Sequence, residues 1–457
     1  MATLPVRPTR KELLTFIEES NLEYATIGFV DYQGTVRGKY VSRNKLLGAL
    51  YKMSFPLVSL ALDPTDAILL APGIAEAESG FADAPVRLLP ETARTIPWER
   101  EGRNLFILSE FTGEAEQYCS RAVYRRIYEQ AEGMGMRPVH AVECEFTLFN
   151  ETAESAAAKG YRDLEVATPH KTYYSLVRQG VQAEFYNELM DMAQAMRIPL
   201  ESLHEEMSDG FMEVAIQYGN NADVPDAAAL FKTFAKIVAQ RNNKLISFMA
   251  RWSTEVDGQS GHIHASLTDL DGKPLFHDDG DTDGMSRTMK YFIGGMQALM
   301  GDFMIMLAPN INSFKRLVPG IFAPISAEWG IENRTCAIRA IPGSPSSSRI
   351  ECRTPGADAN PYLSIAAILA AGLHGIREKM EPTAPTVVNA YDLETPEALR
   401  FPTDFKEAIQ RFHNSKQARD WFGDAFVDAY AGSRATQLEQ FAAMVTDREL
   451  ERFFELV

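Results

Sequence analysis

The feature that most constrains the fold is a pair of glutamates inside an otherwise apolar, β-forming run. Residues 139–149 are typical of a buried strand, yet they contain Glu143 and Glu145. Residues two apart on a strand project from the same face, so a sheet would hold both carboxylates side by side. Buried carboxylates repel each other unless they are protonated, meet cations or bind metal. Because such a pair is more often half-exposed than functional, the rest of the chain must decide its role.

Other acidic and histidine side chains occur at separate points along the chain. They are Glu205 and Glu206 after His204, Glu213 in the apolar run 211–216, His262 and His264 two residues apart, and Glu351 between two arginines. Each has an ordinary alternative, such as a helix-surface carboxylate, a structural histidine or a salt-bridged strand residue. Together they would offer several carboxylates and a histidine from separate strands, which suits hard divalent ions. Zinc is disfavoured because carboxylates dominate and cysteine ligands are absent.

A group of arginines supplies the matching positive charge. They are Arg316, Arg334, Arg339, Arg349 and Arg353, several of them at alternate positions of predicted strands. Planar guanidinium groups bind carboxylate or phosphate through paired hydrogen bonds, although surface ion pairs are an alternative interpretation. The sequence has no Gly-rich loop followed by Lys-Ser or Lys-Thr. A bound nucleotide would therefore be held by metal and arginine rather than by a P-loop.

Composition and charge argue against several other classes. The net charge of −17 disfavours a nucleic-acid partner, because such binders carry basic patches, although solubility alone explains much of the surplus. The four cysteines lack the short paired spacings of zinc or redox sites, so we expect reduced core residues. The N-terminal segment has no apolar signal region and no apolar stretch reaches membrane-spanning length. We therefore expect a cytoplasmic protein.

Hydrophobic periodicity predicts an α+β architecture, and 457 residues exceed what one core usually supports. The first part would contain a helix at 9–19, a hairpin at 24–41 and apolar runs at 67–70 and 105–108, ending near residue 112. The larger part would contain helices at 121–134, 182–196, 226–243, 285–306, 362–379 and 404–414, and strands at 139–149, 211–216, 263–267, 337–340 and 349–354. We expect a curved antiparallel sheet with a site on one face and helices on the other.

Several motifs, in order along the chain, resemble the class I glutamine synthetase superfamily. They are Glu143-Cys144-Glu145-Phe146, the Gly-x-x-x-His-x-His-x-Ser pattern at 258–266, the Asn-Ser-Phe-Lys-Arg-Leu-Val-Pro-Gly run at 312–320, Asn333-Arg334, the run 349–353, and Asn360-Pro361-Tyr362. The resemblance covers essentially the whole chain. It implies a β-grasp-like domain at 1–112 and a catalytic domain at 113–457 with flanking helices and a funnel-shaped sheet. It also implies a homo-oligomeric ring, commonly a dodecamer of two hexamers, in which a neighbour's N-terminal domain completes each site.

The resemblance also implies roles for particular residues, with ATP and two or more Mg²⁺ or Mn²⁺ ions per site. One metal would be held by Glu145, Glu205 and Glu213, and the other by Glu143, His262 and Glu351. The glutamate-binding residues would be Arg316, Arg353 and Gly258. The ATP-binding residues would be His264, Ser266, Arg339 and Arg349, and the catalytic group would be Arg334, Glu351 and His262. The implied reaction activates the side-chain carboxylate of glutamate as an acyl phosphate and joins it to an amine.

Two departures from the family pattern concern the amine. Ammonium-using members carry an Asp-Gly-Ser-Ser loop that is missing from residues 53–63, and their flap glutamate corresponds to Phe322 here. Loss of two carboxylates weakens a pocket for a small bare cation, whereas an aromatic ring favours an amine with a carbon skeleton. We therefore predict a γ-glutamyl amide ligase for an organic amine, similar to the polyamine, methylamide, ethanolamide or anilide branches. The alternatives are a glutamine synthetase with a divergent ammonium pocket and a non-catalytic structural or sensory ring.

Overall fold

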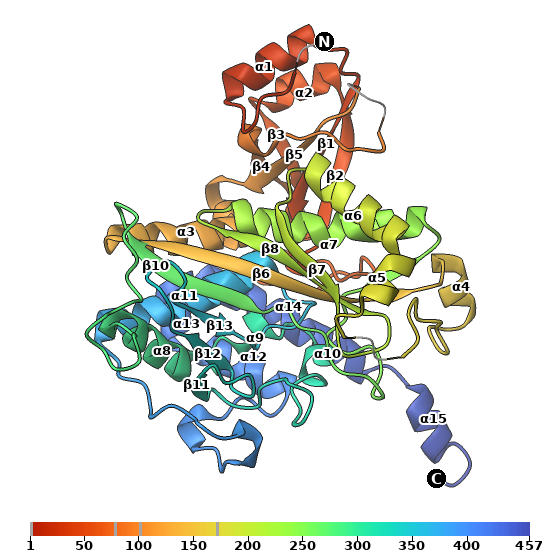
Figure 1. The fold of residues 1–457 in the computed structure, drawn as a ribbon. Helices are drawn as coiled ribbons and strands as arrows, with labels where there is room; N and C mark the ends of the chain where they lie inside the picture. The colour runs from red at the N-terminus through yellow and green to blue at the C-terminus, as the bar shows by residue number, and fades with distance from the viewer. Residues whose placement is uncertain (1–2, 77–79, 100–102, 171–172) are drawn as a thin grey trace.

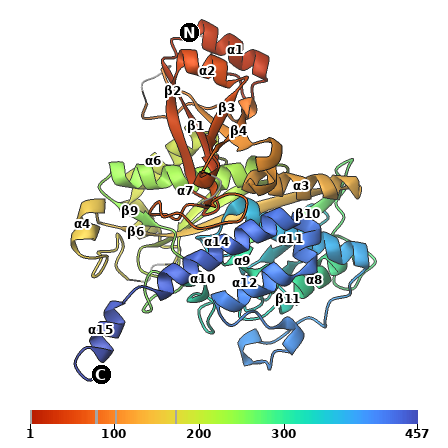
Figure 2. The ribbon, with the colours of Figure 1, turned by 180° about the vertical axis from the view of Figure 1, so that it is seen from behind.

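The computed structural model describes residues 3–76, 80–99, 103–170 and 173–457, and two β-sheets organise them. A five-stranded sheet near the N-terminus stands against a larger eight-stranded sheet, and most helices surround the larger one (Figure 1). The view from behind shows α14 (Asp424–Ala442) running obliquely across this side of the molecule toward the C-terminus (Figure 2). The fold therefore combines helices with mostly antiparallel sheets, in agreement with the α+β architecture that was expected. None of the helices in the described ranges is both long and apolar enough to cross a bilayer.

The smaller sheet has the strand order β2-β1-β5-β4-β3. Its strands are β1 (Tyr24–Val30), β2 (Val36–Ser42), β3 (Met53–Pro56), β4 (Asp83–Leu88) and β5 (Phe106–Phe111), and its helices are α1 (Arg10–Glu19) and α2 (Arg43–Ala49). The expected first helix and hairpin are confirmed. Thr9 and Glu12 form a capping box at the start of α1, in which each side chain accepts a hydrogen bond from the other residue's backbone N–H. The run 67–70 forms only an isolated bridge, between Leu62 and Ile68, rather than a strand.

The larger sheet has the order β11-β12-β13-β10-β6-β8-β7, and β9 pairs with β6. All neighbouring strands are antiparallel except β11 and β12. The strands are β6 (Met136–Phe149), β7 (Leu200–Glu205), β8 (Phe211–Gly219), β9 (Leu245–Ser247), β10 (Ile263–Asp269), β11 (Trp329–Ile331), β12 (Ile338–Ile341) and β13 (Arg349–Cys352). The five predicted strands are confirmed, and β6 forms the centre of the sheet.

Apolar helices cover the face of the sheet that is opposite to the glutamate pair. The helices around the large sheet are α3 (Ser120–Gly133), α4 (Ala153–Ala158), α5 (Leu176–Val181), α6 (Ala183–Ala195), α7 (Asp223–Arg241), α8 (Arg287–Leu299), α9 (Met304–Leu307), α10 (Ile311–Phe314) and α11 (Pro361–Glu378). Cys144 and Phe146 of β6 are buried there, and the Phe146 ring lies 6.3 Å from that of Phe231 in α7. Gly295 and Gly375 let α8 and α11 approach closely, because a Cβ on Gly375 would collide with Gly295.

The C-terminal part is entirely helical. It consists of α12 (Phe405–Asn414), α13 (Lys416–Phe422), α14 and α15 (Asp447–Phe453). The predicted helix at 285–306 is instead divided into α8 and α9, and Gly301 and Asp302 lie at the break. Asp302 accepts a hydrogen bond from Ser415, which ties the break to the start of α13 (2.7 Å). All four cysteines are buried and free, as expected.

Candidate active site

Cross-strand register places acidic and histidine side chains in one row on the open face of the large sheet. Glu145 of β6 lies opposite Glu213 of β8, and Glu213 lies opposite His204 of β7. Directly opposed residues project from the same face of a sheet. Glu143 is two residues before Glu145 and therefore shares that face. The alternation that buries Cys144 on the other face thus produces a charged surface here.

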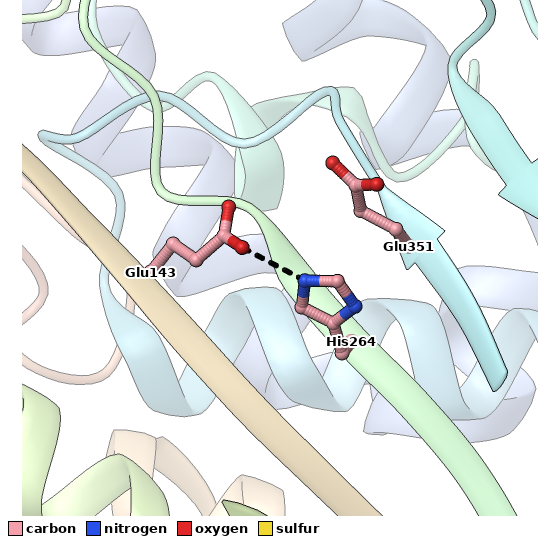
Figure 3. A group of neighbouring side chains, drawn as sticks. All are labelled: Glu143, His264 and Glu351. Atoms are coloured by element: carbon pink, nitrogen blue, oxygen red, sulfur yellow. Dashed lines mark hydrogen bonds and ion pairs between the residues drawn. The ribbon is translucent and has the colours of Figure 1, made fainter. Parts of the chain in front are cut away.

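Glu143 is the centre of a first cluster, which three separate strands build (Figure 3). Its two carboxylate oxygens lie 2.9 Å from His262 Nδ1 and 2.9 Å from His264 Nε2. Glu351 Oε1 lies 3.6 Å from the same Nδ1 atom of His262. Ligand atoms of Glu143, His264 and Glu351 all lie within 4.8 Å of one another, so a single cation can contact all three. The structure thus brings together Glu143, His262 and Glu351 and adds His264 to them.

The charges in this cluster are set by its neighbours. Burial alone would raise the pKa of Glu143, but contacts with His262 and His264 hold that pKa well below its ordinary value. Glu351 is also buried, yet the charges of Arg353 and His262 bring its pKa down to about 2. Both carboxylates are therefore ionised at neutral pH. An ionised carboxylate is the form that binds a hard divalent ion.

A second cluster lies farther along the same face. His204 Nε2 contacts Glu206 Oε1 at 2.9 Å and lies 3.8 Å from Glu213 Oε1. Ligand atoms of these three residues also lie within 4.8 Å of one another. Burial, followed by the charges of Glu143 and Glu145, raises the pKa of Glu213 to about 10. Without a cation, Glu213 therefore keeps its proton at neutral pH.

Glu205 occupies a different position from the one that the sequence pattern suggested. It ends β7 as a buried side chain and accepts a hydrogen bond from the Tyr186 hydroxyl of α6 at 2.9 Å. Successive residues of a strand face opposite sides and residues two apart share a side, so Glu206, two residues after His204, lies beside Glu213 instead. The structure thus groups Glu206, rather than Glu205, with His204 and Glu213. The signal was present in the sequence, because His204 and Glu206 repeat the two-residue spacing of Glu143 and Glu145.

Glu145 lies between the two clusters. It belongs to the same face of β6 as Glu143, and its carboxylate accepts the backbone N–H of Ser260. Burial raises the pKa of Glu145. Five carboxylates thus share one surface: Glu143, Glu145, Glu206, Glu213 and Glu351. This donor set, with histidine nitrogens and without thiolates, fits Mg²⁺ or Mn²⁺.

Arginines from the neighbouring strands adjoin the first cluster. Arg339 Nη1 donates to Glu351 Oε2 at 2.9 Å, and Arg353 donates to the other oxygen of the same carboxylate. Arg353 Nε also donates to the carbonyl of Arg334 at 3.1 Å, whereas the Arg334 side chain lies at the exposed surface. The guanidinium groups of Arg339 and Arg353 therefore stand at the edge of the carboxylate surface.

The residues predicted to bind the nucleotide lie on β10, β12 and β13. Arg349 Nε donates to His264 Nδ1 at 3.2 Å, which leaves His264 Nε2 facing Glu143. Ser266 is two residues after His264 on β10 and projects from the same face. The structure therefore groups His264, Ser266, Arg339 and Arg349 along neighbouring strands.

Arg316 approaches the site from a loop and is almost fully buried. Its two terminal nitrogens donate to the carbonyls of Thr354 (2.9 Å) and Arg353 (3.1 Å). Burial lowers the pKa of Arg316 to about 10, so the group stays cationic at neutral pH. Its Nε is a buried donor without a partner in the described part of the chain. Gly258 is required beside it, because a Cβ there would lie 2.5 Å from the Arg316 side chain.

Phe322 lies at the rim of this surface. Its side chain is half-exposed and its backbone has a φ of 55°. Its carbonyl accepts a hydrogen bond from Arg353 Nη2 at 3.4 Å. The Tyr391 hydroxyl donates to the carbonyl of the next residue, Ala323, at 3.0 Å. The loop that carries Phe322 is therefore tied to the arginine that contacts Glu351.

Comparison with known proteins identifies the family. Residues 117–453 match the family model described as the glutamine synthetase catalytic domain. The chain belongs to the glutamine synthetase family. Type-1 glutamine synthetase 2 of Dictyostelium discoideum is 34% identical over 451 residues, covering 97% of this chain and 86% of that protein. The γ-glutamylethanolamide synthetase of Streptomyces coelicolor is 33% identical over 449 residues, covering 97% of this chain and 95% of that protein.

Solved structures agree with this assignment at the level of fold. A GmaS–ADP complex superposes with a TM-score of 0.82 at 24% identity and covers 97% of this chain and 99% of that chain. The glutamine synthetase family comprises ligases that act on small molecules with ATP and divalent metal ions. The resemblance seen in the sequence motifs is therefore confirmed. The chain is a ligase of this family.

Proposed function

We propose that this protein joins the γ-carboxylate of glutamate to an organic amine through γ-glutamyl phosphate, with ATP as phosphoryl donor. The observation that carries the proposal is the single face on which five carboxylates lie next to a row of arginines. Phosphoryl transfer needs mainly positioning and neutralisation of oxygen charge, which such a face can provide. A protein without catalytic metal chemistry would have no physical reason to hold Glu143, Glu145 and Glu213 together.

In this proposal two divalent ions, Mg²⁺ or Mn²⁺, bind the carboxylate face. The ion nearer the nucleotide would be held by Glu143, His262 and Glu351, and the ion nearer glutamate by Glu145, Glu206 and Glu213. When bound, these ions neutralise the phosphate oxygens during transfer. Glu206 replaces Glu205 in this set, because Glu206 lies in one cluster with Glu213, whereas Glu205 accepts a hydrogen bond from Tyr186.

The arginines would bind the anionic groups of both substrates. Arg316 offers a buried Nε that has no partner among the described residues and that a glutamate carboxylate would satisfy. Arg353 lies beside it, since its carbonyl accepts a hydrogen bond from Arg316 Nη2. Arg339 and Arg349 would contact the phosphates, and the exposed Arg334 would neutralise the transferred phosphoryl group. Cations placed where charge develops lower the barrier to transfer. The acyl phosphate must then be shielded from water until the amine attacks.

Phe322 would form part of the acceptor pocket. The half-exposed ring at the rim can pack against the carbon skeleton of a bound organic amine, which would stabilise the complex. Ammonium has no carbon skeleton for such a contact. The similarity to a γ-glutamylethanolamide synthetase supports an organic amine as acceptor. The second candidate, glutamine synthesis from ammonium, is favoured by the similarity to type-1 glutamine synthetase 2.

A competition assay separates the two candidates. The full-length protein would be incubated with ATP, Mg²⁺, glutamate and an equimolar mixture of ammonium with alkyl, hydroxyalkyl, aromatic and polyamine acceptors. Mass spectrometry of the products should show γ-glutamyl amides of an organic amine in excess over glutamine. Preferential formation of glutamine at low concentration would establish the second candidate. A lack of glutamate-dependent ADP formation with every acceptor would contradict both.

We further propose that residues 1–112 form a β-grasp-like domain and that the chain assembles into a homo-oligomer. The central strands β1 and β5 are parallel within an otherwise antiparallel sheet, which supports the β-grasp interpretation. Helix α15 extends away from the body (Figure 1), and its end exposes apolar side chains, with Phe454 83% exposed and Leu456 86% exposed. A second copy of the chain is the partner that we propose for this arm. Mass photometry before and after removal of residues 446–457 tests it.

A further inference from the structure

The tip of the β1–β2 hairpin is inserted into the larger part of the molecule. Asp31 and Tyr32 are fully buried, and Gln33 is only 8% exposed. The Tyr32 ring makes an edge contact with Tyr430 of α14 at 5.2 Å between centroids. Gly34 has a φ of 77°, and a Cβ there would lie 3.2 Å from the Asn360 backbone, so the turn abuts the start of α11. The tip therefore has the packing of a core segment rather than that of a surface turn.

Arg434 of α14 connects this tip to a loop of the active-site side. The side chain is fully buried, and its Nη1 donates both to Gln33 Oε1 at 3.2 Å and to the carbonyl of Pro309 at 3.3 Å. Its guanidinium carbon lies 5.2 Å from the centre of the Tyr430 ring. The ion pairs found among the described residues do not include Arg434. The hydrogen-bond acceptors of Arg434, which also include Ser433 Oγ, are neutral, although the charges of Asp31 and Asp358 act on it from nearby. Burying a cation is costly, so each of those acceptors matters to where the group sits.

The loop that Arg434 contacts is fastened at two further points. Asn310 Oδ1 accepts from Gln437 of α14 at 2.9 Å, and Asn310 Nδ2 donates to Asp358 at 2.8 Å. Ser313 Oγ donates to the same oxygen of Asp358 at 2.7 Å. Residues 309–316 are thus held from behind by α14 and from the side by the segment that precedes α11. Arg316 closes this loop, with its backbone N–H bonded to the carbonyl of Ser313 at 3.1 Å.

We propose that Gln33 and Arg434 are positioning residues for Arg316. The hairpin tip fixes the Arg434 guanidinium, and Arg434 fixes the carbonyl at Pro309. The segment 309–316, which contains α10, carries that position to the Arg316 side chain. The N-terminal sheet therefore sets the placement of the glutamate site within its own chain. This inference rests on the proposed role of Arg316 in binding glutamate.

Replacement of Gln33 tests the proposal. Gln33→Ala removes one neutral hydrogen bond to a buried cation, so the KM for glutamate should rise about three- to tenfold. The KM for ATP should stay within about twofold, because Arg339 and Arg349 are not attached to this loop. Gln33→Glu keeps an acceptor for Arg434 and should restore the KM for glutamate. Thr35→Ala changes an exposed side chain of the same turn and is the matched control.

Hydrogen exchange provides a readout that does not depend on activity. The amides of residues 309–316 should exchange faster in Gln33→Ala than in the wild type and in Thr35→Ala. Unchanged exchange there, or an equal rise of the KM values for glutamate and ATP, would overturn the proposal. If Gln33→Ala does not fold, Gln437→Leu tests the same loop at Asn310. A wild-type protein without glutamate-dependent turnover would overturn the proposed function alone, since the exchange experiment would still decide the positioning role.

Discussion

Exchange of Glu213 for glutamine would separate metal binding from folding. Burial and the charges of Glu143 and Glu145 raise the pKa of Glu213 to about 10, so the metal-free protein at pH 7.5 carries a neutral carboxyl there. Glutamine imitates that neutral form, and the metal-free variant should be as stable as the wild type to within about 1 kcal/mol. A metal ion must displace the proton of Glu213, which costs roughly 3 kcal/mol at pH 7.5. The apparent affinity should therefore rise about tenfold per pH unit between pH 7 and 9.

Calorimetric titration with Mn²⁺ in two buffers of different ionisation enthalpy measures both effects. The wild type should release close to one proton per ion bound at this site, and Glu213→Gln should lose both that release and the binding step. Saturating Mn²⁺ at about 100 Kd should stabilise the wild type by about 2.7 kcal/mol, and the variant by less. If Mn²⁺ bound with no proton release and with an affinity independent of pH, the charge argument for this site would be refuted.

Four further substitutions give contrasting outcomes. Glu206→Gln should abolish ligase activity and weaken Mn²⁺ binding, whereas Glu205→Gln should keep activity and cost only about 1 kcal/mol in urea unfolding, because Glu205 bonds Tyr186 outside the cluster. Phe322→Glu should shift the ratio of kcat/KM for ammonium over organic amines upwards by about tenfold, measured in the competition assay. Burial lowers the pKa of His140 to about 4, below about 6.5 in the unfolded chain, so the unfolded state binds the extra proton. The free energy of unfolding should therefore fall by roughly 3 kcal/mol as the pH drops from 6.5 to 4, and His140→Phe should flatten that part of the profile.

The site was predictable where strand alternation alone decides it. Glu143, Glu145 and Glu213 lie on one face because their strands are regular and their neighbours are apolar. The predicted ligand Glu205 lies at the end of β7, a strand that the sequence did not predict. Glu206 is followed by the exposed Met207 and then by polar residues, so no buried apolar side chain fixes the phase there. The hydrogen bond to Glu205 comes from Tyr186 of α6, a distant element, and the local sequence pattern could not predict it.

The fold was predictable where a long stretch of the sequence carries a clear signal for one helix. The capped helix at α1 and the apolar helix α11 carry such signals. Strand β4 was missed because Pro85 lies inside it, and proline usually marks an edge or a break. The helices after residue 415 were missed as well, and α14 is buried along much of its length without a simple polar side. Tertiary contacts with the hairpin tip, such as that of Tyr430 with Tyr32, determine its packing.

The two parts of the site belong to different kinds of structure, and this affects how each part can vary. The carboxylate and histidine groups stand on antiparallel strands, whereas Phe322 lies on a turn at the rim of that surface. Substitutions in such a loop leave the strand register intact, so the loop can change while the sheet keeps its side chains in place. Under the proposed function, the preference for an amine can thus change through a few loop residues, with the carboxylate surface kept.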